Sequence, residues 1–162
     1  MSRMSLMILA GLASCSALAQ TKISGSLQCT RPQLHNTVQV ADRTPHEMVI
    51  SQRSCDWSKP LSIEGVNSKD DVLSLFTDKQ PDRARDHGYN IISMSNGDKV
   101  FMHYRESVES KGRNASSGAG TFVLSGGTGK FQGIYGRGTL ASQRGTTGTM
   151  TVQIEGEYTL PK

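Results

Sequence analysis

Apolar residues along this chain occur in short segments, and clusters of turn-forming residues separate one segment from the next. This pattern is typical of an all-β sandwich or barrel. No window of roughly 11–18 residues has apolar positions at helical spacing, so we expect little helix. Before the C-terminal third of the chain, the predicted strands are residues 23–30, 36–41, 46–55, 61–63, 72–77, 89–95 and 100–106.

The last predicted strand has the clearest alternation. Met150, Val152, Ile154 and Tyr158 fall on one side of an extended chain, and threonine, glutamine and glutamate fall on the other. This period of two gives one apolar face, which we expect to point into the fold. About eight strands in a single antiparallel sheet are enough to close a barrel. The interior of such a barrel is either filled by side chains or just wide enough for one small ligand.

Three polar segments are predicted to connect strands. Residues 95–98 contain Asn-Gly between two apolar segments, which is a strong signal for a β-hairpin. Residues 77–88 are the most polar run of the chain, and we expect them to form an exposed loop. Residues 109–120 are predicted to form a second, longer loop.

The N-terminus has the composition of a targeting segment. Arg3 precedes a short apolar run that ends in an A-L-A cleavage site, so residues 1–19 are predicted to be a signal peptide and residues 20–162 a single β-barrel domain. The run is far shorter than the roughly 20 residues of a transmembrane helix. A second interpretation stays open, because the segment LASC resembles a lipoprotein box in which Cys15 would carry the lipid. The protein is therefore predicted to be exported to the periplasm or the extracellular space, either free or anchored to the envelope through Cys15.

Charge and histidine spacing exclude several classes of partner. Cleavage after residue 19 of the 162-residue chain leaves 143 residues and lowers the net charge from +4 to about +3. No basic run or basic-aromatic stripe occurs, so no nucleic-acid partner is predicted. No metal or cofactor is predicted either, because no C-x-x-C or H-E-x-x-H spacing occurs. The histidines expected at the surface or in turns are His35, His46, His87 and His103.

Residues 122–140 alternate glycines with bulky apolar residues, which distinguishes them from a flexible polar linker. We interpret them as two strands joined by a turn at residues 125–130, where glycine allows positive φ. Later glycines such as Gly138 would mark bends or close backbone approach in the second strand. A phosphate-binding loop is excluded, because Leu124 and Phe131 stand where it needs a glycine and a hydroxyl residue. The glycine spacing of dinucleotide-binding folds is absent as well.

The segment GGTGKFQGIYGRG in this stretch resembles the glycine-rich segment of the allene oxide cyclase and dirigent β-barrel family, and above all that of its small secreted bacterial members. The segments GDKVFMHYRES and GTMTVQIEGEYTLP fit the same pattern, so the resemblance covers most of the chain after the leader. It implies a calycin-type barrel. Plant cyclases of the family isomerise a fatty-acid epoxide in the barrel, and dirigent proteins hold phenolic radicals while they couple. No catalytic residue of either group matches a position here, so no activity is carried over. Plant members often form trimers, and the resemblance permits a homo-oligomer.

Cleavage or lipidation removes Cys15 from pairing and leaves Cys29 and Cys55. An even pair in an exported chain predicts a disulfide. Closing a loop of this length contributes about 3 kcal/mol in the chain-entropy model. Trp57 follows two residues later and is predicted to pack over the disulfide or at one end of the barrel.

Glu106 is the candidate for catalytic chemistry. It shares the parity of Val100, Met102 and Tyr104, which would place its carboxyl group inside the barrel, where burial shifts a pKa. The alternative is that Glu106 ends its strand in solvent, as glutamate usually does. The inward positions predicted to contact a ligand are Tyr104, Met150, Ile154 and Tyr158.

Three functions are compatible with these features. The residues favour a binding protein over an enzyme, namely an exported barrel that binds a small apolar or amphipathic molecule in its interior. An isomerase or cyclase acting on a lipid-like or phenolic substrate in the same cavity is the second. The third is a filled barrel without a ligand that serves as an envelope or interaction module.

Overall fold

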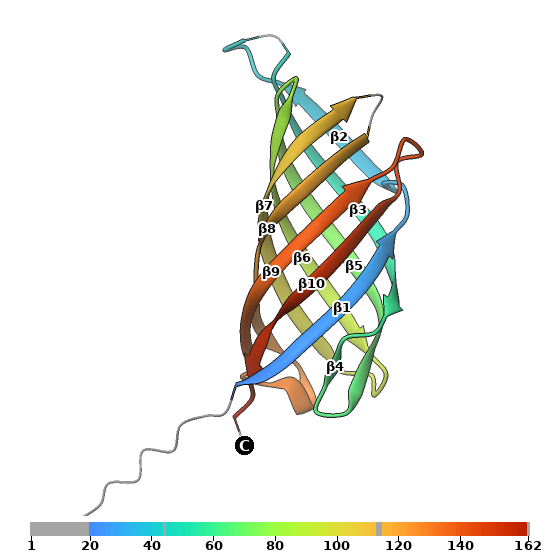
Figure 1. Cartoon of the computed structure of the whole chain (residues 1–162), viewed down its shortest axis with the longest axis vertical. Coiled ribbons are helices and arrows are strands. Elements are labelled where there is room, and N and C mark those ends of the chain that lie inside the picture. Colours follow the sequence, from blue (N-terminus) through green and yellow to red (C-terminus); the bar gives the residue numbers. More distant parts are fainter. Residues whose placement is uncertain (1–19, 44, 113–114, 162) are drawn as a thin grey trace, which may run out of the picture.

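The computed structural model of the chain describes residues 20–43, 45–112 and 115–161 (Figure 1). Its strands are β1 (Thr21–Cys29), β2 (Leu34–Gln39), β3 (Glu47–Lys59), β4 (Ser62–Ile63), β5 (Val66–Lys79), β6 (Arg83–Met94), β7 (Lys99–Gly112), β8 (Ala115–Gly127), β9 (Tyr135–Arg144) and β10 (Met150–Thr159). A short 3-10 turn, η1 (Gly129–Phe131), links β8 to β9. Among these residues, no helix is long and apolar enough to cross a membrane. The predicted signal peptide, including Cys15, lies outside the described residues.

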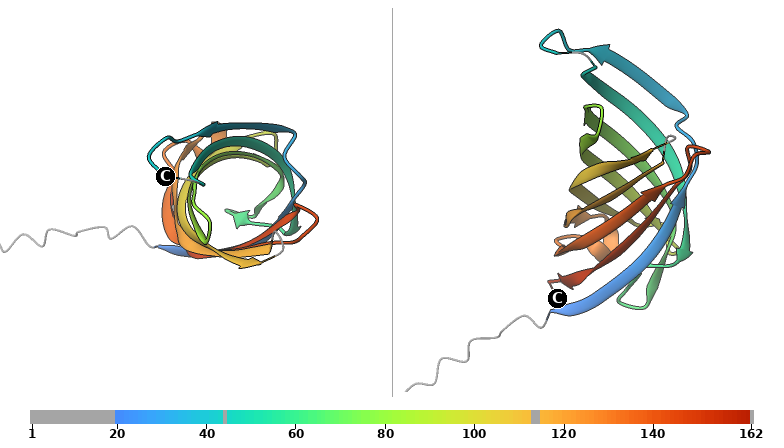
Figure 2. Two further views of the ribbon diagram at one scale, coloured as in Figure 1. Left: turned by 90° about the horizontal axis from the view of Figure 1, so that it is seen from above. Right: turned by 45° about the horizontal axis from the view of Figure 1, so that its top comes forward.

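Eight of the strands close into an antiparallel barrel, which confirms the predicted all-β fold (Figure 2). Their order around the ring is β1, β10, β9, β8, β7, β6, β5 and β3, and β3 pairs back to β1. One edge of β3 pairs with two strands in succession: its N-terminal half pairs with β2, and its C-terminal part pairs with β1. The exposed strand β2 therefore continues the barrel wall beyond the end of β1.

The disulfide between Cys29 and Cys55 is confirmed. The two residues lie opposite each other on β1 and β3, with 3.9 Å between their Cα atoms. The pairing of β1 with β3 covers only four residue pairs, fewer than any other pairing around the ring. The disulfide thus closes the ring covalently at the place where the hydrogen-bonded pairing is shortest.

The lower end of the barrel in Figure 1 is closed by two segments that fold across it. The β4 hairpin contributes Leu61 and Ile63, and the segment around η1 contributes Phe131 and Ile134; none of these side chains is more than 2% exposed. The two segments are joined by a hydrogen bond of 3.0 Å that Lys130 Nζ donates to the backbone carbonyl of Glu64, in the turn after β4. Above them most of the inward side chains are large and apolar and pack into one core, so the lower half of the barrel is filled.

Inward-facing glycines let large side chains lie flat against the wall of this filled half. A Cβ atom on Gly138 would come within 2.6 Å of the Phe122 ring, and one on Gly25 within 2.6 Å of the Trp57 ring. A Cβ atom on Gly138 would also overlap the backbone oxygen of Glu155, so the close backbone approach predicted for this glycine is confirmed. Trp57 is 9% exposed and packs inside the barrel against Gly25.

Two of the predicted loops are strands instead. β5 continues to Lys79 and β6 begins at Arg83, so only three residues of the segment 77–88 lie outside a strand. Residues 109–120 likewise belong mainly to β7 and β8. Both predictions were wrong because these parts of the strands carry no large apolar residue that would reveal an alternation. Residues 109–112 are exposed, and the inward positions of 77–88 and 115–120 are polar or small.

The two predicted turns have different outcomes. The hairpin at residues 95–98 is confirmed, because Met94 N donates a hydrogen bond of 2.9 Å to the carbonyl of Asp98. In the glycine-rich stretch the strand β8 extends through Gly127, and the chain turns through η1 to Ile134. This turn is later than the predicted one at residues 125–130. Gly133, with φ of 78°, supplies the left-handed conformation that it needs.

Candidate functional site

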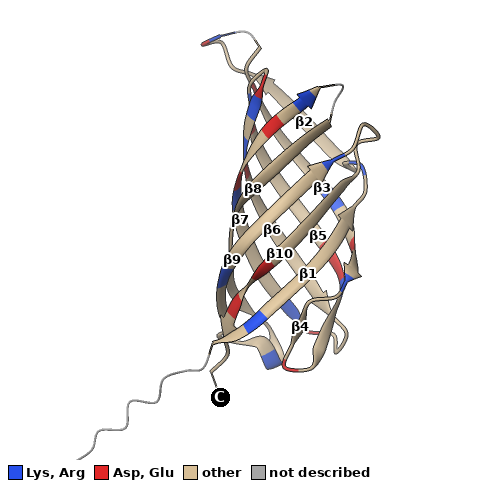
Figure 3. Cartoon of the chain, in the orientation of Figure 1, with Lys and Arg blue, Asp and Glu red and all other residues tan. Residues whose placement is uncertain are grey.

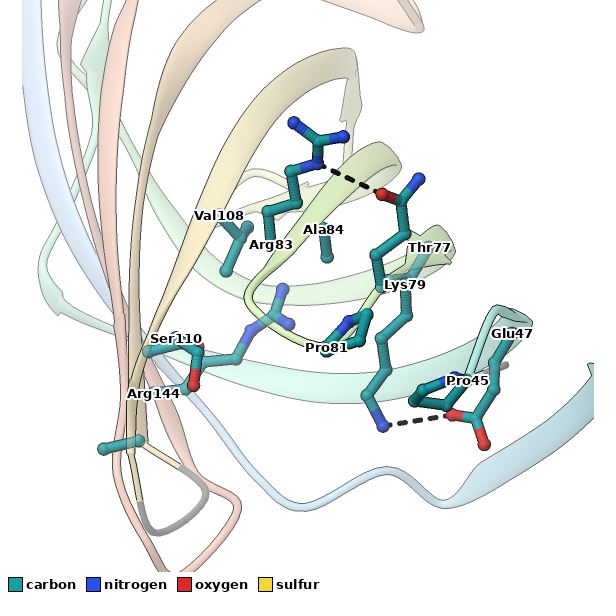
Figure 4. A pocket seen from close by; sticks show the side chains of 13 residues that line it. Pro45, Glu47, Thr77, Lys79, Pro81, Arg83, Ala84, Val108, Ser110 and Arg144 are labelled. Carbon is teal, nitrogen blue, oxygen red and sulfur yellow. Dashed lines mark hydrogen bonds and ion pairs between the residues drawn. The ribbon is translucent and has the colours of Figure 1, made fainter. Parts of the chain in front are cut away.

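The upper end of the barrel holds a cavity of about 590 Å³ (Figure 4). It lies where β5, β7 and β9 end and where β3, β6 and β8 begin. Ala84, Val108 and Pro81 are among its apolar lining residues. A smaller cavity of about 210 Å³ shares Lys79 and Arg144 with it and is also lined by Arg53. We call the two adjoining cavities together the mouth.

Charged side chains at the rim of the mouth are held by neighbouring side chains. Lys79 Nζ donates to Glu47 Oε2 at 3.0 Å, and Arg83 Nε donates to Gln80 Oε1 at 3.1 Å (Figure 4). Acidic and basic residues are also interspersed along the strands elsewhere (Figure 3). Exposed pairs of this kind add little to stability. Their effect at the rim is to surround the opening with polar groups.

Below the mouth, polar side chains from β3, β6, β7 and β9 gather inside the barrel. The members of this floor cluster are Arg53, Asp86, Tyr104, Glu106, Ser142 and Arg144. Asp86 and Glu106 lie opposite each other on β6 and β7. Arg144 Nη2 donates to the carboxylate of Asp86 and lies 3.6 Å from Glu106 Oε1. Apart from Arg144, every member of the cluster is at most 7% exposed.

The floor cluster forms because polar residues occupy inward positions on adjacent strands while small residues face them. Asp86 and Glu106 follow the strict alternation of buried and exposed residues in β6 and β7. Gly88 accommodates the ring of Tyr104, which lies where a Cβ atom would otherwise be. Gly118 accommodates Glu106 in the same way. A larger residue at either glycine would occupy the space that the cluster uses.

Among the residues that the structure describes, Arg53 is a buried cation without a carboxylate partner. It is 7% exposed, and its Nη1 donates to the carbonyls of Thr30 at 3.0 Å and Gly148 at 2.8 Å. No carboxylate of the described residues forms an ion pair with it. Burial, together with the positive charge of Arg144, lowers the pKa of Arg53. Buried charges are normally paired, so this arrangement is unusual.

Several buried atoms of the floor cluster have no hydrogen-bond partner in the described part of the protein. They are Arg53 Nε, Asp86 Oδ1, Tyr104 Oη, Glu106 Oε1 and Arg144 Nε. Most buried polar atoms in proteins are paired, because an unpaired one costs about 1–3 kcal/mol. The set contains both donors and acceptors, so the floor cluster has unused hydrogen-bonding capacity next to the mouth.

The pKa values of several ionisable groups in the floor cluster are shifted from their ordinary values. Burial raises the pKa of Glu106 to about 7, and the nearby charge of Asp86 adds to the rise. Burial alone would lower the pKa of Arg144, but the carboxylates of Asp86 and Glu106 outweigh it and raise that pKa. Burial also raises the pKa of Tyr104 well above its usual value, so the hydroxyl stays neutral and can donate a hydrogen bond. Near pH 7 the cluster can therefore exchange a proton at Glu106.

A second buried polar pair lies deeper in the barrel. Asn90 Nδ2 donates to both carboxylate oxygens of Asp71, at 3.0 Å each. Burial raises the pKa of Asp71 to about 7, although the hydrogen bond from Asn90 opposes the shift. Neither residue lines the mouth. The pair is therefore relevant to stability and is not part of the candidate site.

The structure places the sequence-predicted site residues in two groups. Glu106 is 4% exposed and its strand continues to Gly112, so the alternative that it ends the strand in solvent is wrong. Tyr104 belongs to the floor cluster. Met150 is buried in the upper half, opposite the last residue of β9. Ile154 and Tyr158 lie in the filled lower half. There the Tyr158 hydroxyl accepts a hydrogen bond from the backbone N–H of Glu64 and donates one to its carboxylate.

Of the four histidines, His46 lies in the connection between β2 and β3, which agrees with the predicted turn position, but its side chain is buried. His46 is 7% exposed, with Nδ1 at 2.6 Å from Asp42 Oδ1 and Nε2 at 2.8 Å from Asp78 Oδ1. These two hydrogen bonds raise the pKa of His46. The arrangement fastens the connection after β2 to the rim. In the described segments, no group of three or more His, Cys, Asp or Glu side chains is placed to hold a metal ion.

The sequence does not single out four members of the floor cluster: Arg53, Asp86, Ser142 and Arg144. For Arg53 a signal exists, because it shares the parity of Cys55 and Trp57, which face inward on the same strand. Asp86 gives no such signal, since it lies in the most polar run of the chain. Only the pairing of the strands shows that these residues meet.

Comparison of the chain with protein-family models, with curated proteins and with solved structures gives no match. The resemblance to allene oxide cyclase and dirigent barrels therefore stays a prediction for the family, although the barrel itself is confirmed.

Proposed function

We propose that this protein is an exported β-barrel that binds a small amphipathic molecule in its mouth, with the polar end of the ligand on the floor cluster. The observation that carries the proposal is the cavity of about 590 Å³ above buried donors and acceptors without partners. Ligand sites of roughly 300–1,000 Å³ usually combine an apolar lining with a few polar groups that fix orientation. Export is supported by the disulfide, since disulfides persist in oxidising compartments.

The packing of the barrel limits where the ligand lies. The lower half is filled by large apolar side chains, so binding belongs to the upper half. Ala84 and Val108, with the neighbouring Val49 and Leu75, provide apolar surface for the body of the ligand. The rim and the floor are polar, which favours an amphipathic molecule over a purely apolar one.

Native mass spectrometry of the protein purified from the periplasm of its own host tests the proposal. We expect a bound small-molecule mass that is lost in Ala84→Phe, because the new ring fills the cavity. Ala141→Phe is the matched control, since Ala141 is exposed on the outer wall of the barrel, and should retain the mass. If no bound mass is found and no amphipathic compound binds the purified protein, the third function, a filled barrel without a ligand, takes its place.

An isomerase or cyclase is the second candidate, and one observation favours it. The pKa of Glu106 is about 7, which suits a group that takes up and releases a proton near neutral pH. Arg144 connects Glu106 to the lining of the mouth. If the protein is such an enzyme, we expect it to convert the bound molecule, and Glu106→Gln should abolish this turnover without loss of the fold. Binding without any conversion of the ligand would exclude it.

A further inference from the structure

Among the described residues, the charges that face the mouth leave one cation without a partner of opposite charge. Lys79 is paired with Glu47, and Arg144 is paired with Asp86. Arg83 lies at the exposed rim, where water screens its charge. Arg53 is buried and lines the smaller cavity of the mouth, and within the described residues its hydrogen bonds go to two backbone carbonyls only. The remaining carboxyl group of the floor, Glu106, lies 3.6 Å from Arg144 and forms no ion pair with Arg53 in the described protein, and with a pKa of about 7 it is only partly ionised at pH 7.

The two arginines of the floor cluster also share one cavity. Arg53 comes from β3 and Arg144 from β9, and both line the smaller cavity. The Nε atom of each lacks a hydrogen-bond partner in the described protein. A guanidinium group offers donors in a planar fork, which matches two oxygen atoms of a carboxylate, sulfate or phosphate group. An anionic oxygen pair would bind these donors and neutralise the buried charge at the same time.

We propose that the floor of the mouth is an oxyanion site, in which Arg53, with Arg144 beside it, holds the anionic head group of a small amphipathic ligand. This inference rests on the proposed function and names its ligand class. The apolar body of the ligand then lies against Ala84 and Val108 toward the opening. A neutral polar head group satisfies the unpartnered donors, but it leaves the charge of Arg53 uncompensated.

Isothermal titration of the mature protein at pH 7 with compounds that share an eight-carbon chain tests this site. The probes are octanoate, octyl sulfate, octyl phosphate, octan-1-ol and octylamine. We expect at least one of the three anions to bind about tenfold or more tightly than the alcohol, because charge-assisted hydrogen bonds to a buried guanidinium are strong. The amine should not bind. The three anions distinguish a carboxylate from a sulfate or phosphate ligand.

Substitutions at Arg53 connect this preference to the site. In Arg53→Met the affinity for the preferred anion should fall about 10- to 100-fold while the affinity for octan-1-ol is unchanged. Arg85→Met is the control, because Arg85 is exposed on the outer face of β6 and should leave all affinities unchanged. Arg53→Lys keeps the charge and loses the fork, so it should weaken anion binding less than Arg53→Met. It also provides the test if Arg53→Met does not fold, as circular dichroism will show.

The outcomes separate this inference from the proposed function. Equal binding of the alcohol and the anions, abolished by Ala84→Phe, overturns the oxyanion site and leaves binding in the mouth intact. Anion binding that survives both Arg53 variants, or that Ala84→Phe does not affect, also overturns it. If none of the five compounds binds, the oxyanion site is rejected, and the native mass spectrum of the protein from its own host then decides whether the mouth binds an amphipathic ligand at all.

Discussion

The hydroxyl of Ser142 donates a hydrogen bond of 2.8 Å to Glu106 Oε2, although the two residues lie on β9 and β7 with β8 between them. The residue of β8 at this level is Gly118. A Cβ atom there would lie 2.5 Å from Glu106 Oε2 and 2.7 Å from the Ser142 hydroxyl oxygen. The absence of a side chain at Gly118 is therefore what allows Ser142 and Glu106 to meet over β8.

Replacing Gly118 by alanine should disrupt this connection. The added methyl group overpacks the floor cluster, and we expect a loss of about 1–3 kcal/mol in the free energy of unfolding. Urea denaturation measures it. Gly145→Ala is the control, because the nearest atom to its Cβ would be at 3.6 Å, an ordinary contact. Equal stability of the two variants would show that the space beside Gly118 is not needed.

Asp71 should make the protein less stable as the pH rises. Its pKa is raised from 3.8 to about 7, so the neutral form favours the folded state fully below pH 3.8 and this contribution is lost as the pH rises through 7. Asp71→Asn cannot ionise. Between pH 5 and pH 8 it should therefore gain on the order of 2–3 kcal/mol relative to the wild type.

The measurement for Asp71 is urea denaturation of both proteins at the two pH values. Glu106 titrates in the same direction, so the variant retains part of the pH dependence. The exposed Asp56 gives the control, Asp56→Asn, whose curve should stay parallel to that of the wild type. A parallel curve for Asp71→Asn as well would mean that Asp71 is ionised in the folded protein at neutral pH.

Anion binding should weaken as the pH rises above 7. Glu106, with a pKa of about 7, then becomes negative beside the bound oxyanion. The groups that face it are Asp86 from β6, Ser142 and Arg144 from β9, and Tyr104 from its own strand. Among them, Arg144 stays charged in this range because its pKa is raised.

Linkage then predicts up to about a tenfold loss of affinity between pH 6 and pH 8, and Glu106→Gln should flatten this profile. Octyl sulfate is a suitable probe, because its own charge does not change in this range. An affinity of the wild type that is constant from pH 6 to pH 8 would contradict the placement of Glu106 next to the ligand.

Removing the disulfide should destabilise the barrel. The double variant Cys29→Ala, Cys55→Ala releases a loop closed over a sequence separation of 26, for which we expect a loss of about 3 kcal/mol in the free energy of unfolding. Reduction of the wild type with dithiothreitol should give the same loss, which controls for the packing of the cysteine side chains. A loss below about 1 kcal/mol would show that β1 and β3 hold together without the covalent link.

The sequence predicts the apolar half of this fold well. The alternation of Met150, Ile154 and Tyr158 identifies both the last strand and its inward face, because each inward residue there is apolar. The same reasoning places Tyr104 inside and, by parity, offers Glu106 as an inward residue. A binary pattern of apolar and polar residues is sufficient wherever the interior is dry.

The polar half could not be predicted in this way. Asp86 and its neighbours alternate between inside and outside, but both faces of the strand are polar or small, so the pattern resembles an exposed loop. Ser142 and Arg144 are inward residues of β9, and they could not be predicted for the same reason. Recognising the floor cluster needs the pairing of β6 with β7 and the contacts across β8, which depend on residues far apart in the sequence.

The most direct test of ligand binding in the mouth is to follow the arginine side-chain Nε–H signals of the ¹⁵N-labelled protein by NMR during titration with the tightest-binding octyl anion. The Nε atoms of Arg53 and Arg144 have no partner within the described protein, so an oxyanion that reaches the floor must change their signals. We expect both to shift and to saturate together at one ligand per protein, while the signal of the exposed Arg85 stays in place. Binding that saturates without moving the signals of Arg53 and Arg144 would contradict a ligand site in the mouth of this barrel.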